Sequence, residues 1–329
     1  MQSAQMTRSG MGGFSMIEMM ISITIGLVIV AALVGVLTSS SSSTKSNSRS
    51  SELQSNGRFA LDYLKRELRQ AGYRGYTWAE PTTPSTTLTA ITNECLVAGA
   101  AAASFVANIR QGVWGANDNN PFAASCIPAS KYNSTINSDV LLIRRVASDI
   151  LTGNSVANTF YFRSSYSLGE VYRGTGAAAL AGAPVLSGAP TPQADFALQE
   201  AVYYIGKDDN DATMPALRRV TLVADAMVDE MVVSGIEQMQ VQYGRLDTAS
   251  NTQYYNADSI SGGPSDSPVT STTYAWDEVN SVRIWLLART AKAETGYSNT
   301  TSYVMGDKTY TVNDSIRRQL YTAVIQMRN

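Results

Sequence analysis

One charged residue stands inside the longest apolar run of the chain, and its position limits the chemistry open to it. Glu18 is the only Asp, Glu, Lys or Arg between Phe14 and Leu37. A charge at the centre of a bilayer costs about 2.5–3.5 kcal/mol. Glu18 lies instead in the first turn or two of the expected helix, where a carboxylate can reach the interface and meets the positive end of the helix dipole. Taken alone, this pattern indicates a signal anchor with a tolerated acidic residue.

The element that must position Glu18 is a helix over residues 14–37. At about 1.5 Å per residue, an apolar helix of this length spans a hydrocarbon core of about 30 Å. The residues before it are polar, carry one basic side chain, Arg8, and end in Gly12 and Gly13. The sequence therefore predicts a short leader over residues 1–13, followed by a transmembrane or filament-core helix.

A small residue, then Phe14, then Glu18 and an unbroken apolar helix resembles the class III signal of type IV pilins. The resemblance implies that a prepilin peptidase cleaves between Gly13 and Phe14 and methylates the new amine of Phe14. It also assigns Glu18, then the fifth residue of the mature chain, to subunit assembly. A secretory signal is the alternative, since Thr38-Ser39-Ser40 could act as a small-residue cleavage site after the apolar region.

Composition excludes several classes of site. The chain has 329 residues, a net charge of −2, no histidine and two cysteines, and 16% of its residues are charged. The missing histidine removes the commonest general base and metal ligand, and no Cys/His zinc site can be assembled. The low charge argues against a nucleic-acid surface. We therefore expect no catalytic residues, no cofactor and no metal.

The two cysteines, Cys95 and Cys126, lie in a polar segment rich in Ser, Thr, Asn, Gly and Tyr, which is typical of a secreted β-rich domain. In an oxidising compartment this pair predicts one disulfide. Two unpaired buried thiols are the alternative.

A second segment over residues 38–72, which unlike the first is amphipathic, continues the N-terminal helix. Gly72 is a natural stop, and one apolar stripe has residues mostly three or four apart: Leu53, Ala60, Leu61, Leu64, Leu68 and Ala71. The serine run 38–51 joins the two segments without Pro or Gly, so one helix from about Phe14 to Ala71 is predicted, weak in that run. Strand patterns then follow at Asp139–Val146, Thr159–Arg163, Gln199–Ile205, Leu217–Leu222, Met227–Tyr243, Val279–Arg289 and Arg318–Arg328.

One long helix before many strands is an α+β pattern, with residues 38–72 continuing the helix and residues 73–329 forming a largely antiparallel β-rich head. Short helical and loop patterns fill the gaps, with a short helix at 98–107, a loop within 112–128, a long loop at 174–192 and polar insertions at 82–89 and 248–273.

Three blocks beyond the leader sharpen the resemblance. They are residues 56–76, residues 233–244 with 276–289, and residues 317–329, and together they are similar to PilW-type minor pilins of Gram-negative type IV pili. Tyr76 departs from the pattern, because many relatives have cysteine there, so no disulfide is carried over from the family.

The PilW resemblance implies a subunit that works by contact and is not an enzyme. Its expected partners are other minor pilins, the major pilin, a large tip adhesin and the prepilin peptidase, and it helps to prime pilus assembly. The head lies in the periplasm while the helix anchors it in the inner membrane, and the subunit then sits at the pilus tip. A J-type pseudopilin of type II secretion and a membrane-anchored periplasmic enzyme are the alternatives.

Two other motifs are weighed for binding. Lys207-Asp208-Asp209-Asn210-Asp211 carries carboxylates that suit Ca²⁺, but it lacks EF-hand spacing and is interpreted as a solvated turn. Three arginine pairs, 144–145, 218–219 and 317–318, lie on predicted strands or at a strand end. Alternation along a strand points the members of such a pair to opposite faces, so they predict no basic stripe.

Overall fold

A computed structural model describes residues 13–78, 88–133, 136–181, 184–264 and 276–327. The chain divides into two compact units, residues 1–50 and residues 51–329, and each is described by itself. Most of the predicted leader, most of the polar segment 82–89, and Arg328 with Asn329 lie outside the described residues.

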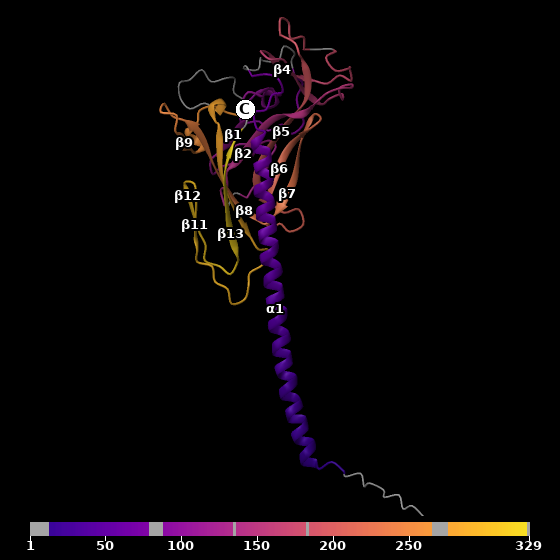
Figure 1. The fold of residues 1–329 in the computed structure, drawn as a ribbon, viewed down its shortest axis with the longest axis vertical. Coiled ribbons are helices and arrows are strands. Elements are labelled where there is room, and N and C mark those ends of the chain that lie inside the picture. Colours follow the sequence, from indigo (N-terminus) through magenta and orange to yellow (C-terminus); the bar gives the residue numbers. More distant parts are fainter. Residues whose placement is uncertain (1–12, 79–87, 134–135, 182–183, 265–275, 328–329) are drawn as a thin grey trace, which may run out of the picture. The chain divides into compact units, whose positions relative to one another are not determined.

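The described elements are two helices, two 3₁₀ turns and thirteen strands, labelled in Figure 1 where there is room. They are α1 (Met16–Arg69), α2 (Ser104–Ala107), β1 (Val113–Ala116), β2 (Val140–Ile150), β3 (Phe160–Ser164), β4 (Gly169–Arg173), β5 (Ala194–Lys207), β6 (Pro215–Val223), β7 (Ala226–Ser234), β8 (Ile236–Leu246), β9 (Thr252–Tyr255), η1 (Ala257–Ser259), η2 (Trp276–Glu278), β10 (Ser281–Arg289), β11 (Ser302–Met305), β12 (Lys308–Thr311) and β13 (Arg318–Gln326).

Helix α1 confirms the prediction of one long N-terminal helix, with slightly narrower bounds than predicted. The serine run stays helical, and hydroxyls in this region donate back to carbonyls of the preceding turn. Thr38 Oγ1 donates to Val34 O at 2.9 Å, and Thr44 Oγ1 donates to Ser40 O at 2.9 Å. Through such bonds, the hydroxyl groups find hydrogen-bond partners within the helix and do not interrupt it. After Arg69 the chain turns, and Gly72 takes a φ of 78°, the left-handed conformation that favours glycine at a helix end.

The head, within residues 51–329, contains two antiparallel sheets and a hairpin. One sheet has the order β1-β2-β5-β3-β4, with β6 paired to β5 and β7 to β6; the second has the order β13-β10-β8-β9; β11 and β12 form the hairpin. Every ladder between two of these strands is antiparallel. The predicted α+β class, a long helix packed on an antiparallel β-rich head, is therefore confirmed.

The second half of α1 packs into the core of this head. Its buried positions are mostly three or four residues apart, and all but Gly57 belong to the predicted stripe: Leu53, Gly57, Ala60, Leu61, Leu64 and Leu68. Leu64 and Leu68 are completely buried and join one core with the inward residues of both sheets, such as Val202 of β5 and Ile284 of β10. The same spacing that makes the helix amphipathic therefore makes it the central element of the head.

Several local predictions need correction. The block 227–243 is two strands, because Gly235 breaks it with a φ of 83°. Alternating apolar residues at 239, 241 and 243 predict a half-buried strand, but β8 is buried on both faces, since Gln238 and Gln240 are also buried. Their amides find partners there: Gln238 Nε2 donates to Ile136 O at 3.1 Å, and Gln240 Nε2 donates to Asp118 Oδ1 at 3.0 Å.

The loops also hold more structure than predicted. Strand β1 lies inside the predicted loop region 112–128, and β9 lies inside the insertion 248–273, part of which is outside the described residues. The predicted short helix at 98–107 is reduced to α2. These strands are four residues long, too short for a periodic signal in the sequence.

Candidate assembly interface

The first unit presents an apolar helical surface that no other described part of that unit covers. Every large apolar side chain from Phe14 to Leu37 in this segment is more than half exposed, from 53% at Val34 to 87% at Phe14. The segment lies in the one described helix that is long and apolar enough to cross a membrane. Exposed apolar surface on this scale marks a membrane or protein contact.

Glu18 is held at the start of α1 by a reciprocal cap. The Ser15 backbone N–H donates to Glu18 Oε2 at 3.2 Å, while Ser15 Oγ accepts from the Ile17 backbone N–H at 3.4 Å. Ser15 is the residue before the helix and Glu18 is its third helical residue, so S-x-x-E forms a capping box. The Glu18 carboxylate therefore contacts the backbone of Ser15, the residue after Phe14. The resemblance predicts that Phe14 carries the new amine.

The second half of α1, whose buried residues run from Leu53 to Leu68, contacts strand β13 through a glycine. A Cβ on Gly57 would lie 2.2 Å from a ring carbon of Tyr321 on β13, so only glycine lets that ring lie against the helix. One residue earlier, Asn56 Nδ2 donates to Ser234 O at 3.2 Å, at the end of β7. These contacts join α1 to the last strands of both sheets.

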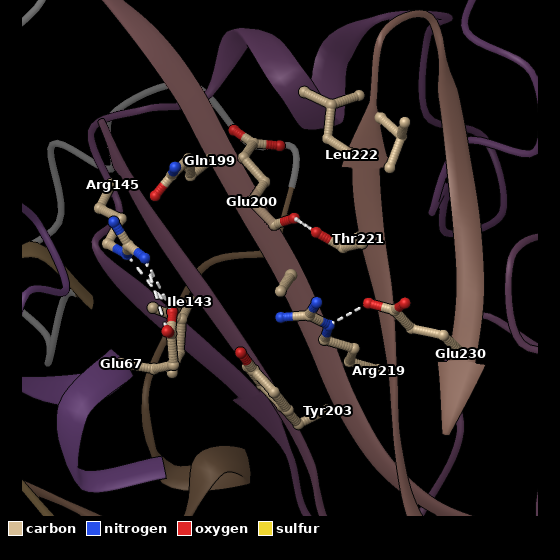
Figure 2. A pocket seen from close by; sticks show the side chains of 12 residues that line it. Glu67, Ile143, Arg145, Gln199, Glu200, Tyr203, Arg219, Thr221, Leu222 and Glu230 are labelled. Atoms are coloured by element: carbon tan, nitrogen blue, oxygen red, sulfur yellow. Dashed lines mark hydrogen bonds and ion pairs between the residues drawn. The ribbon is translucent and has the colours of Figure 1, made fainter. Parts of the chain in front are cut away.

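Polar side chains continue the contact toward the end of α1. Arg145 of β2 forms an ion pair with Glu67 at 3.2 Å. Arg219 of β6 donates to the Tyr63 hydroxyl and pairs with Glu230 of β7. Figure 2 shows these charged groups around a cleft of about 380 Å³ over the sheet.

The lining of this cleft is charged, but the charges neutralise one another. Glu67 faces Arg145, and Arg219 faces Glu230. Among the described residues, no group of three or more Asp, Glu, Cys or His side chains could hold a metal. The cleft therefore offers a polar surface lined by paired charges.

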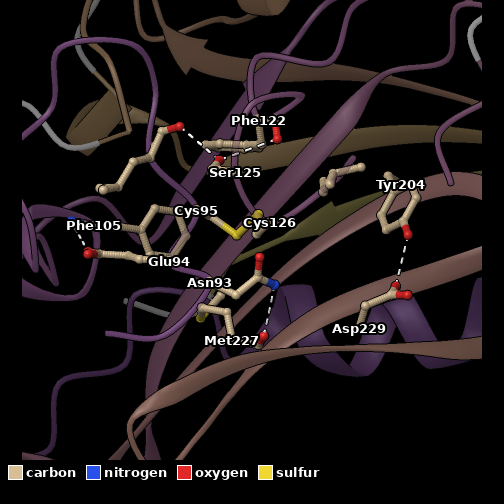
Figure 3. Close-up of a disulfide and its surroundings, with 12 residues drawn as sticks. Asn93, Glu94, Cys95, Phe105, Phe122, Ser125, Cys126, Tyr204, Met227 and Asp229 are labelled. Atoms are coloured by element: carbon tan, nitrogen blue, oxygen red, sulfur yellow. Dashed lines mark hydrogen bonds between the residues drawn. A yellow bond between two sulfur atoms is a disulfide. The ribbon is translucent and has the colours of Figure 1, made fainter. Parts of the chain in front are cut away.

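The two cysteines are bonded in the structure. The Cys95 and Cys126 sulfurs are 1.98 Å apart, with Cα atoms 4.8 Å apart, and both residues are buried. Figure 3 shows aromatic rings around the bond, including Phe105 and Phe122, whose centroids are 6.1 Å apart in an edge-on arrangement. Next to it the Glu94 carboxylate accepts from the backbone N–H groups of Ala103 and Phe105 and orders the chain that enters α2.

Two buried carboxyls have raised pKa values. Burial raises the pKa of the Asp139 carboxyl to about 8, although its oxygens accept from the backbone N–H groups of Asp118 and Val241. Burial likewise raises the pKa of Glu200 to about 8, against the opposing pull of Arg144, whose Nε lies 3.4 Å away. Both groups are buried in the head, and Glu200 also belongs to the lining of the cleft in Figure 2.

The three arginine pairs serve internal ion pairs. Arg144 contacts buried Glu200 while Arg145 reaches Glu67 on the helix, as the alternation predicts. The other pairs behave similarly, with partners Asp229 and Asp209 for Arg218, Glu230 for Arg219, Glu294 for Arg317, and Glu237 and Asp314 for Arg318. In the acidic turn, Asp208 Oδ1 accepts backbone N–H groups of the turn itself.

Sequence reasoning missed two residues of this interface. Ser15 was missed although S-x-x-E before an apolar run is a known start signal. Gly57 lies inside the predicted helix but was not singled out, although a glycine inside an amphipathic helix signals close approach of a neighbour. The ring that approaches, Tyr321, lies far along the chain, and no local pattern points to it.

Comparison with known proteins gives two family matches and one structural neighbour. Residues 8–34 match the prokaryotic N-terminal methylation motif, and residues 202–329 match the family of type IV pilus-assembly protein W. A type IV-like pilin from Thermus thermophilus is a structural neighbour with 13% identity and a TM-score of 0.34, over 84% of this chain and 96% of that chain. No curated protein gives a significant match.

The methylation motif and the exposed apolar helix together define a membrane-anchored pilin, a class of structural proteins that associate with other pilins. The match over the last part of the head, together with the methylation motif, supports a PilW-type minor pilin with a prepilin leader and a role in type IV pilus assembly.

Proposed function

We propose that this minor pilin primes type IV pilus assembly and stays in the tip complex, together with other minor pilins, the major pilin and a large tip adhesin. The observation that carries the proposal is the apolar helix surface over residues 14–37, exposed in its own unit and preceded by the methylation motif. Such a surface needs lipid before assembly and other helices after it.

Before assembly, the subunit spans the inner membrane once with its head in the periplasm. A prepilin peptidase cleaves between Gly13 and Phe14 and methylates Phe14. The paired charges around the cleft support a role in contact, because Glu67 pairs with Arg145 and Arg219 pairs with Glu230. A disulfide between Cys95 and Cys126 fits an exported head, since that compartment is oxidising.

The test is a deletion strain complemented with the wild-type chain. We expect few surface pili in the deletion strain, restored pili on complementation, and a mature N-terminus at N-methylated Phe14 by mass spectrometry of pilus-enriched fractions. Loss of protein secretion with normal pili would instead support the J-type pseudopilin. A mature chain that starts after Ser39 would contradict processing by a prepilin peptidase.

A further inference from the structure

The last strand of the head has one unpaired edge. In the four-stranded sheet, β13 pairs with β10 over its whole length, from Arg318 opposite Arg289 to Gln326 opposite Ser281. Among the described residues, no strand pairs with its other side. Strand β13 is therefore an edge strand of nine residues.

The register shows which backbone groups face outward. At the two ends of the ladder, the Thr290 N–H donates to Arg317 O and the Met327 N–H donates to Asn280 O, both at 2.9 Å. Hydrogen-bonded pairs alternate along an antiparallel ladder, so the odd-numbered residues 319–325 bond to β10. Leu320, Thr322 and Val324 then direct their N–H and C=O groups to the open side.

The side chains of β13 do not protect this edge against pairing with another strand. Residues 319–326 contain no charge and no proline, and Val324 is 57% exposed. Edge strands of soluble proteins are normally protected by charges, proline, short length or a covering segment. The other edges of the head follow that rule among the described residues: β1 and β9 have four residues each, and β4 carries Glu170 and Arg173.

Strand β7 is another edge strand and has the same length as β13, so the protection of the two edges can be compared directly. It carries Asp229 and Glu230, and its start is covered by Thr92, which exchanges backbone hydrogen bonds with Asp225 and Met227 at 2.9 Å. The side chains on the inward face of β13 are packed, since Tyr321 lies against Gly57 and Ile325 is buried. In the part of the chain that the structure describes, the outward edge of β13 lacks such protection.

We infer that the outward edge of β13 binds an extended, uncharged segment of another pilus subunit as an additional strand. This inference rests on the minor-pilin role, which supplies a partner in permanent contact with the head. A lipid surface does not fit the edge, because unpaired backbone groups are costly in hydrocarbon. Main-chain hydrogen bonds to residues 320, 322 and 324 would hold the segment, and the exposed Thr322 and Val324 side chains would favour β-branched neighbours.

Val324→Pro tests the pairing in the full-length protein. It removes an outward N–H without taking a hydrogen bond from β10, so we expect co-purification of other minor pilins from membranes to fall about tenfold. Val324→Thr keeps a β-branched, uncharged residue and should behave as wild type. Circular dichroism checks that each variant folds.

Where Val324→Pro does not fold, Val324→Lys replaces it, because an edge lysine opposes strand pairing. Its matched control is Val304→Lys on β11, an equally apolar and exposed position at 63%. We expect only the change at 324 to lower co-purification and pilus number. Equal behaviour of the two lysine variants would overturn the inference.

A photo-crosslinking amino acid at position 324, with position 304 as control, identifies the occupant. The expected adduct joins position 324 to an extended peptide of another pilin of the same pilus. An adduct with a second copy of this chain, or none in assembled pili, would overturn the inference. A deletion strain with normal pili would contradict the assembly role itself, whereas normal function of the 324 variants contradicts only the strand pairing.

Discussion

The two halves of helix α1 are continuous in backbone but differ in what their side chains contact. In residues 14–37 apolar residues surround the helix on all sides and are exposed in their own unit. In residues 53–68 the apolar residues form one stripe, which is buried in the head. An all-round apolar helix is suited to lipid or to a bundle, whereas a stripe is suited to one packed face. The same helix can therefore serve anchoring and folding separately, and each half can be disrupted without the other.

The largest expected effect concerns processing of the first half. Gly13→Arg should abolish cleavage, because a bulky charge cannot occupy a site shaped for glycine, and uncleaved chain should accumulate in the membrane. Gly26→Ala is the matched control, since a Cβ there meets nothing within 4 Å. Mass spectrometry of the N-terminus provides the measurement, and normal cleavage of the arginine variant would remove the assigned site.

Substitutions at Glu18 separate two roles within that half. Glu18→Gln keeps an acceptor for the Ser15 N–H but loses the charge, whereas Glu18→Ala loses both. If the carboxylate pairs with an amine of a neighbouring subunit, both variants should be cleaved normally yet yield few pili, with Ser15→Ala close to wild type. Electron-microscopic counts of surface pili measure the outcome. Wild-type pilus numbers in the glutamine variant would show that Glu18 acts only as a cap.

The disulfide should matter only to the second region. Replacing Cys95 and Cys126 together by serine should lower the free energy of unfolding of the head by about 3–4 kcal/mol in the chain-entropy model. Denaturant unfolding of the full chain in detergent measures the loss, and membrane insertion and cleavage should not change. Non-reducing mass mapping that finds two free thiols in the exported wild-type protein would contradict the bond.

Glycine substitutions compare the two halves most directly. Gly57→Ala should destabilise the head by about 1–3 kcal/mol, because its Cβ would overlap the Tyr321 ring. Gly35→Ala makes the same chemical change in the first half, where a Cβ meets nothing within 4 Å. Thermal unfolding followed by near-ultraviolet circular dichroism should separate the two variants. Equal melting temperatures would contradict the close contact of helix and β13.

A last difference is a pH dependence confined to the head. Because burial raises the pKa of Asp139 from 3.8 to about 8, its contribution to stability is fully present below pH 3.8 and is lost as the pH rises through about 8. The melting temperature of the wild type should therefore fall from pH 5 to pH 9, and that of Asp139→Asn should fall less. Some slope should remain in the variant, because the pKa of Glu200 is also raised to about 8. Parallel curves for the two proteins would contradict the raised pKa of Asp139.

The sequence by itself determined the features that depend on local pattern. The apolar run, the stripe from Leu53 to Leu68 and the Gly72 stop predicted α1 closely, because helix periodicity extends over many turns. Strong strands such as β10 were predicted for a similar reason, since period-2 alternation over nine residues is unlike a helix. Gly13, Phe14 and Glu18 were assigned by their resemblance to the class III signal of type IV pilins, which needs no tertiary information.

Only the tertiary structure decided which of these elements meet. It placed Tyr321 on Gly57, buried both sides of β8, and paired the Arg144 and Arg145 side chains with partners on opposite faces. It also left the outward edge of β13 open, although the sequence of that strand resembles that of any buried strand. The physical reason is that burial and pairing are properties of contacts between distant residues, and a local pattern shows how apolar a segment is but not which neighbour will cover it.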